Sequence, residues 1–149
     1  MNNKPCLLVE AGKEKQIATS KVYAGDIIKV IDGETFPADL VLLSSSSKNM
    51  CYIETANLDG ESNYKQRRAL TETTKFTTPE MCEKLKGSRI TCGGPDNRLY
   101  EFEGTFHMPS TIAGDLTLQA SLVGGDTSAT SESSEDLKFP LGYVFYFTL

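Results

Sequence analysis

Residues Cys51–Ser62 read CYIETANLDGES, and this stretch is the most informative part of the chain. Its first part, Cys51–Ala56, contains aromatic and β-branched residues that favour a strand. Its second part, Asn57–Ser62, contains the pair Asp59-Gly60, which is typical of turns because glycine adopts positive φ and aspartate bonds nearby backbone. The stretch therefore predicts a strand that positions a loop.

Short apolar runs bounded by turn residues precede this stretch. Cys6–Val9, Asp26–Ile31 and Asp39–Leu43 each read as a strand. Pro37 cannot donate to a strand ladder, so it belongs to the connection before the third run. Ser44–Ser47 is expected to end that strand in a polar tip.

The remainder of the chain is also mostly strand by pattern. Further strands are expected at Tyr64–Leu70, Arg89–Cys92, Arg98–Glu103 and within the final FPLGYVFYFTL at 139–149. A flexible acidic Ser/Thr/Gly loop is expected at about 124–136, since it cannot bury enough apolar surface to order itself.

One short helix is predicted at Pro79–Lys86. Thr78 suits the N-cap, Pro79 the first helical position, and Gly87 the residue just past the end. Strands with turn signals and one helix predict a mainly β domain, a distorted jelly-roll or β-sandwich with a short peripheral helix.

Composition narrows the function classes. The chain has 149 residues and a net charge of -5, so one domain is expected and nucleic acid is excluded as a partner, because phosphate binding needs clustered cations. No apolar stretch reaches the roughly 18 residues that cross a bilayer. The four cysteines lack zinc-site spacing and are expected to be free thiols.

Three motifs in order carry a resemblance to a known family. They are GDIIKV at 25–30, FPADLVLLSSS at 36–46 and CYIETANLDGESN at 51–63. Together they resemble the actuator domain of P-type ATPases, and most of all its lipid-flippase branch. The resemblance is strong over about residues 20–70 and weaker through RLYEFEG at 98–104. It implies one actuator-type domain over residues 1–149.

The resemblance implies catalytic candidates. In that family a loop reading TGES, or DGET in the flippases, promotes hydrolysis of a phosphoaspartate formed on another domain. The matching residues here are Asp59, Gly60, Glu61 and Ser62. Gly60 lets backbone come close, and the Glu61 carboxylate can orient and deprotonate water. Asp59 and Ser62 hold the loop or contact the phosphoryl group, with loop capping as the equal alternative for Asp59.

Cofactors and partners also follow from the resemblance. It implies ATP and magnesium for the full-length pump, with no cofactor or metal ligand on this chain. It implies phosphorylation and nucleotide domains as partners in cis and a phospholipid carried by membrane helices. An accessory membrane subunit is a further partner that the resemblance allows. The chain holds no DKTGT motif, so it is expected to be a cytosolic segment of a multi-pass membrane protein, without turnover alone.

Other functions stay open at this point. PLG at 140–142 is followed only by YVFYFTL, which departs from the family pattern and fits a truncation or a divergent gene product. A truncated pump gene would give a non-catalytic β-sandwich that docks on a partner, and the same motifs would serve a cation pump. A hydrolase with Glu54 and Glu61 as acid and base rests only on two nearby carboxylates.

The remaining residues receive plainer interpretations. Lys65, Arg67 and Arg68 form the only basic cluster and are interpreted as a solvated strand face. His107 is assigned no function, because no partner for a catalytic base is near it in sequence. The side chains expected in the core are Val30, Phe36, Leu40, Leu42 and Ile53.

Overall fold

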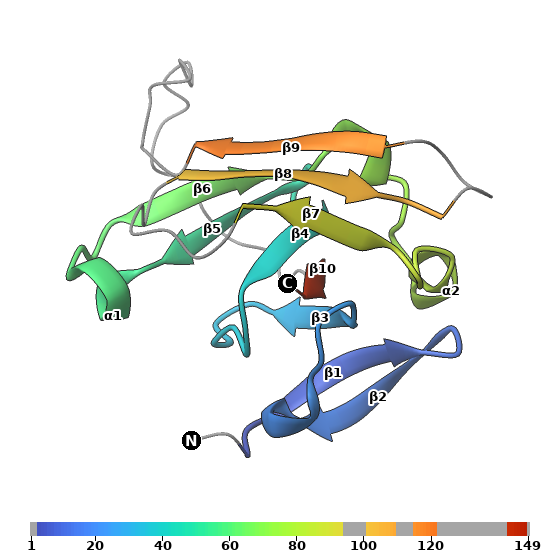
Figure 1. The fold of residues 1–149 in the computed structure, drawn as a ribbon. Helices are drawn as coiled ribbons and strands as arrows, with labels where there is room; N and C mark the ends of the chain where they lie inside the picture. The colour runs from blue at the N-terminus through green and yellow to red at the C-terminus, as the bar shows by residue number, and fades with distance from the viewer. Residues whose placement is uncertain (1–2, 94–100, 110–114, 122–142, 149) are drawn as a thin grey trace.

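The computed structural model describes residues 3–93, 101–109, 115–121 and 143–148. Strands dominate these ranges and form three antiparallel sheets of five, two and three strands (Figure 1). The mainly β fold predicted from the sequence is confirmed. No helix in the described ranges is long and apolar enough to span a bilayer.

The largest sheet combines the two ends of the chain. Its strand order is β2-β1-β3-β10-β4, so the last strand lies between two strands from the first third. The strands are β1 (Pro5–Glu10), β2 (Lys13–Ala18), β3 (Ile27–Ile31), β4 (Leu40–Ser45) and β10 (Tyr143–Thr148).

The two smaller sheets lie together above the largest one in the view of Figure 1. A hairpin of β5 (Met50–Glu54) and β6 (Tyr64–Arg68) forms the two-stranded sheet. The three-stranded sheet consists of β7 (Arg89–Cys92), β8 (Glu101–His107) and β9 (Asp115–Ser121).

Helices are short. The predicted helix is present as α2 (Pro79–Glu83), where the Thr78 hydroxyl accepts from the backbone N–H of Met81 at 3.3 Å. It ends earlier than predicted, and turns continue to Gly87, whose φ of 87° only glycine adopts readily. A second helix, α1 (Ala56–Asp59), was not expected. Two 3-10 turns lie at Thr19–Lys21 and Thr71–Thr73.

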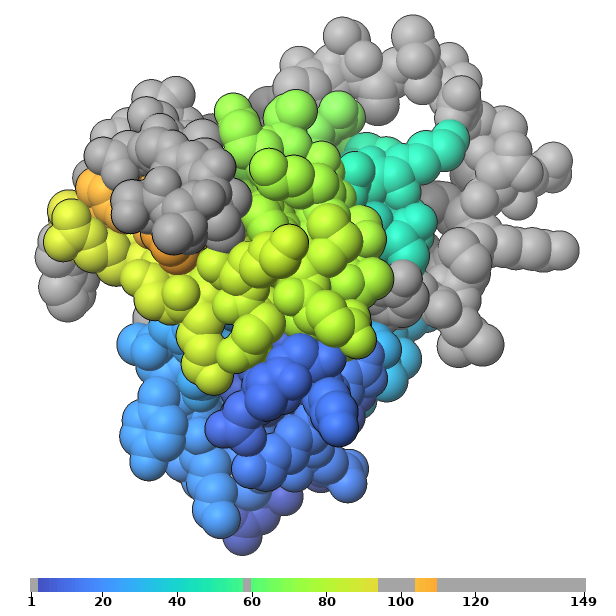
Figure 2. Space-filling view, turned by 90° about the vertical axis from the view of Figure 1, so that its right-hand side faces the viewer, coloured from blue at the N-terminus to red at the C-terminus, as the bar shows by residue number. Residues whose placement is uncertain are grey.

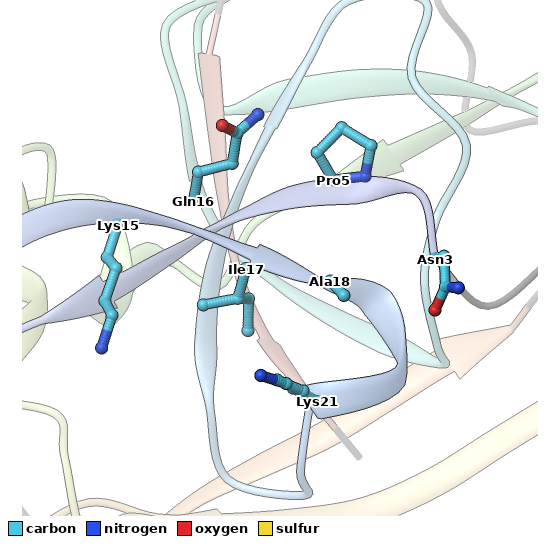
Figure 3. Close-up of a pocket in the computed structure, with 7 residues that line it drawn as sticks. All are labelled: Asn3, Pro5, Lys15, Gln16, Ile17, Ala18 and Lys21. Carbon is cyan, nitrogen blue, oxygen red and sulfur yellow. The ribbon is translucent and has the colours of Figure 1, made fainter.

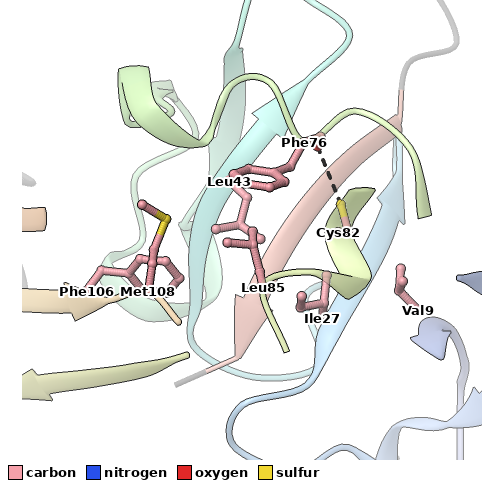
Figure 4. Close-up of a cluster of buried hydrophobic side chains, with 8 residues drawn as sticks. All are labelled: Val9, Ile27, Leu43, Phe76, Cys82, Leu85, Phe106 and Met108. Atoms are coloured by element: carbon pink, nitrogen blue, oxygen red, sulfur yellow. Dashed lines mark hydrogen bonds between the residues drawn. The ribbon is translucent and has the colours of Figure 1, made fainter. Parts of the chain in front are cut away.

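Apolar side chains alternate between two core clusters because successive strand residues point to opposite faces. On β4, Val41 and Leu43 reach one cluster, whereas Leu40 and Leu42 reach the other. The first cluster brings β strands and α2 together (Figure 4), and its buried members are Val9, Ile27, Leu43, Phe76, Cys82, Leu85, Phe106 and Met108. The second consists of Ile28, Val30, Leu42 and Ala69, with Cys51 packed against it.

The N-terminal hairpin packs under α2. Figure 2 shows the segment around α2 lying directly on β1 and β2. The contact is close at Gly12, whose backbone N–H donates to Glu83 Oε2 at 3.5 Å. A Cβ at Gly12 would lie 3.5 Å from Cγ of Glu80, so the turn and the helix are in van der Waals contact.

Strand β4 extends beyond its predicted end at Leu43 and contains an irregularity. Phe145 pairs with Ser44 and Tyr146 with Leu42, so the register skips Leu43, as in a β-bulge. The strand continues to Ser45 and buries two serines, which were expected to end it. Burial is tolerated because the Ser44 hydroxyl donates to the Phe76 carbonyl at 2.5 Å, and the Ser45 hydroxyl accepts from the N–H of Ser47.

Some predictions about the core and the strands differ from the structure, and others concern residues outside the described ranges. Phe36 is 36% exposed and is not core, whereas Val30 and Leu42 are buried as predicted. Strand β9, at Asp115–Ser121, is a strand that the sequence pattern did not predict. Strand β2 was missed because it opens with charged residues, which are common on a sheet edge. The expected acidic loop at about 124–136 and residues 98–100 lie outside the described residues.

Candidate functional site

The site is the loop that closes the β5–β6 hairpin. The strands pair from Met50↔Arg68 to Glu54↔Tyr64, which leaves residues 55–63 as the connection. At the other end of the hairpin, Ala69 belongs to the second core cluster and its N–H donates to the Asn49 carbonyl at 2.9 Å. The hairpin is thus anchored at its base and carries the loop at its tip (Figure 1).

The stretch Cys51–Ser62 changes from strand to loop earlier than the sequence predicts. Strand β5 ends at Glu54 rather than Ala56, because Thr55, with φ -116° and ψ 21°, leaves the extended region. The next four residues form α1, so the loop begins as a helical turn. One bond closes it, from the Gly60 N–H to the Ala56 carbonyl at 2.9 Å. A single turn is marginal alone, so the hairpin holds it.

Gly60 ends this turn in the left-handed region, with φ 73° and ψ 1°. A Cβ placed on it would meet nothing within 4 Å. The requirement for glycine within this chain is therefore conformational, because other L-residues lose about 1–2 kcal/mol in that region. Close approach to a second domain, the reason given from sequence, stays a prediction. Asp59 is the last residue of α1.

Glu61 follows Gly60 and projects into solvent. Its side chain is 61% exposed, and Oε2 lies 3.7 Å from Nζ of Lys65, whose side chain is only 16% exposed. Ser62 is exposed beside it. The four predicted catalytic residues therefore occupy the end of α1 and the turn that follows it, with a cation four residues further on.

The basic cluster is not uniformly solvated, which corrects its interpretation. Lys65 and Arg67 are half-buried, opposite Ile53 and Cys51 on β5, whereas Arg68 is exposed. Burial lowers the pKa of the Arg67 guanidinium, an effect that nearby Cys51 partly opposes. Sequence reasoning missed Lys65 as a neighbour of Glu61, because a spacing of four residues brings side chains together in a helix, whereas here it runs from the loop into β6.

Two other places in the described residues carry polar groups, but neither adjoins the α1 turn. His107 Nε2 lies 2.9 Å from the Thr91 hydroxyl across β7 and β8, a contact that fits a structural role. A pocket of about 450 Å³ opens against β1 and β2 (Figure 3). Its lining includes Lys15, which already pairs with Glu10 at 2.9 Å, and it contains no residue of the α1 turn.

Comparisons with known proteins identify the family. A family model described as the P-type ATPase actuator domain matches residues 1–93. A phospholipid-transporting ATPase of Schizosaccharomyces pombe is 41% identical over 109 residues, which is 72% of this chain and 9% of that protein. Phospholipid-transporting ATPase IC of Xenopus tropicalis is 42% identical over 108 residues, 70% of this chain and 8% of the relative.

A third relative covers more of the chain. Phospholipid-transporting ATPase IG of Homo sapiens is 34% identical over 137 residues, which is 89% of this chain and 12% of that protein. The chain thus spans between 8% and 12% of the length of these three relatives. The resemblance drawn from the motifs is confirmed. On the matched residues and these identities, the chain belongs to the P-type ATPase actuator-domain family.

Proposed function

We propose that this chain is the actuator domain of a phospholipid-transporting pump, and that its Asp59–Ser62 loop promotes hydrolysis of an aspartyl phosphate formed on another domain. The relatives' names support the phospholipid cargo. The order of the family motifs along the sequence supports the loop's role.

One observation carries the catalytic part. Glu61 is 61% exposed at the end of a hairpin whose base is fixed in the core. A base that acts on a group held by a different domain must project from its own, and it must do so reproducibly. The left-handed Gly60 provides that reproducibility, because it fixes where the chain turns out of α1.

The proposed step is the attack of water on phosphorus. The Glu61 carboxylate accepts a proton from the water as the new P–O bond forms, and the bond from phosphorus to the aspartyl oxygen breaks. The aspartate leaves as a carboxylate and inorganic phosphate is released. We assign Ser62 the role of donating a hydrogen bond to a phosphoryl oxygen, and Asp59 the role of holding the loop.

The remainder of the reaction lies in parts of the pump outside this chain. We assign ATP and magnesium to the phosphorylation and nucleotide domains, which act as partners in cis. The phospholipid is assigned to membrane helices on a multi-pass protein, with this domain on the cytosolic side and an accessory membrane subunit as a further partner. No turnover is expected from the chain alone.

Replacement of Glu61 in the full-length protein tests the proposal. Glu61→Gln keeps the shape of the side chain but removes the base, so the phosphoenzyme should persist, with decay slowed about 100-fold or more. Decay is measured by labelling with radioactive ATP followed by a chase. Phosphoenzyme that decays at the wild-type rate would show that Glu61 is not the base.

Glu54→Gln is the matched control. Glu54 is another exposed carboxylate of the same hairpin, opposite Tyr64. We expect normal decay in this variant. A comparable loss in both variants would instead favour Glu54 and Glu61 as an acid and base pair. ATP hydrolysis stimulated by phospholipid, rather than by a cation, separates the lipid pump from the cation pump.

A further inference from the structure

The ion pair between Lys65 and Glu61 joins the exposed loop to the half-buried face of β6. We propose that Lys65 is a positioning residue: it holds the Glu61 carboxylate at the loop and offsets its repulsion from the phosphoryl group. This inference rests on the proposed function of Glu61.

The two partners differ in how firmly they are held. Lys65 is the second residue of β6, across from Ile53, and its side chain is 16% exposed. Its neighbours Tyr64 and Gln66 point outward and are exposed. The stem of Lys65 is therefore fixed by packing, whereas Glu61 is 61% exposed and can move. The cation thus defines where the carboxylate rests.

Stability gives little reason for a lysine here. An ion pair with one exposed partner contributes little to folding, and fixing a lysine side chain has a cost in rotamer entropy. The half-buried stem would pack as well with an uncharged end, as in methionine. A charge at this position is better explained by what it does for Glu61 than by the fold.

Electrostatics shows what that contribution is. A carboxylate and a phosphoryl oxygen that come close together repel each other, and the repulsion is stronger near a protein surface than in bulk water. A cation 3.7 Å from the carboxylate offsets much of this repulsion. Arg67 lies on the same face two residues further on, but its guanidinium donates to the Gln66 carbonyl at 2.8 Å. Of these two cations of β6, Lys65 is the one that pairs with Glu61.

The test compares phosphoenzyme decay in full-length variants. Lys65→Met keeps the stem and removes the charge, and should slow decay on the order of tenfold, because misplacing a catalytic group lowers the rate. Lys65→Arg restores the charge and should recover decay to within about threefold of wild type. Thermal unfolding of the 149-residue chain should be nearly the same for all three proteins.

Lys86→Met is the matched control. Lys86 pairs with Glu83 at 3.4 Å near α2, at the opposite end of the molecule from α1 (Figure 1). This variant loses a comparable ion pair and the same charge, and its phosphoenzyme should decay normally. Slow decay in Lys86→Met would show that net charge, and not position, is responsible, which would overturn the inference.

A double variant separates action through Glu61 from independent action. Adding Lys65→Met to Glu61→Gln should slow decay no further, because a positioning residue has no effect once its base is gone. A further tenfold loss would overturn the inference. Normal decay in Lys65→Met while Glu61→Gln is trapped would overturn it too, and leave the proposed function standing. Normal decay in Glu61→Gln would reject both.

Discussion

The hydroxyl of Thr73 donates to the backbone carbonyl of Leu43 at 2.6 Å, and Leu43 is the β4 residue that the β10 register skips. Both side chains are fully buried. A carbonyl at a bulge has no ladder partner opposite it, so a buried side chain from another segment takes that place. The segment after β6 is thereby bonded to the central sheet.

Thr73→Val should lower the free energy of unfolding by about 1–3 kcal/mol, because the shape is kept while a buried carbonyl loses its donor. Urea denaturation of the chain measures this. Thr74→Val is the comparison, since the Thr74 hydroxyl makes only an exposed local bond to the Thr71 carbonyl. It should change stability by less than about 0.5 kcal/mol. Equal effects of the two substitutions would contradict the assignment.

Gly60→Ala should destabilise the chain by about 1 kcal/mol, solely through its backbone conformation. The φ of 73° is the cause, since a Cβ there has open space around it. Gly93 also has open space, without a positive φ, so Gly93→Ala should have an effect of a few tenths of a kcal/mol at most. Gly60→Asn should fall between the two. Denaturant midpoints that do not distinguish the two alanine variants would count against the left-handed turn.

Ala11→Asn should stabilise the chain by about 0.5–1 kcal/mol. Glu10 pairs with Lys13, so Ala11 and Gly12 form a two-residue hairpin turn, with φ of 52° and 70°. A turn with two positive φ values favours asparagine followed by glycine, and alanine is strained there. Ala24→Asn, at an exposed position with ordinary φ, controls for the added amide. A lower melting temperature for Ala11→Asn would reject this account of the turn.

The cysteines should differ in reactivity. Cys82 is fully buried, and burial raises the pKa of its thiol from 9.0 to about 12, whereas Cys92 is exposed. Iodoacetamide at pH 8 should label Cys92 quickly and Cys82 only after unfolding, as read by mass spectrometry. The folded state holds the Cys82 proton more tightly than the unfolded state does. The free energy of unfolding should therefore fall as pH rises from about 9 toward 12. Early labelling of Cys82 would contradict its burial.

Patterns within one element were readable from the sequence. The cap at Thr78 and Pro79 located α2, and the apolar runs between turn residues located β3 and most of β4. Strand β7 has the predicted bounds, Arg89–Cys92. These signals are local, since each depends on neighbours a few residues away.

Features that depend on distant contacts were not readable. In β4, Ser44 bonds to the Phe76 carbonyl and the strand pairs with β10. Both partners are distant in sequence, so the extension through Ser45 could not be predicted from the residues around the serines. The edge strand β2 forms because β1 is beside it. At the candidate site, the sequence indicated a turn at Asp59-Gly60 but not the helical turn α1 that Gly60 ends. The proximity of Lys65 to Glu61 depends on where α1 ends.

The position of β10 between β3 and β4 affects how the domain is made on the ribosome. Strands β3 and β4 are synthesised early, yet the partner that joins them comes from Tyr143–Thr148. The central sheet therefore cannot close until those residues have left the exit tunnel, however long the earlier strands have waited. During that interval the edges of β3 and β4 that later pair with β10 are open to other strands, so incorrect strand pairing is a hazard of the nascent chain.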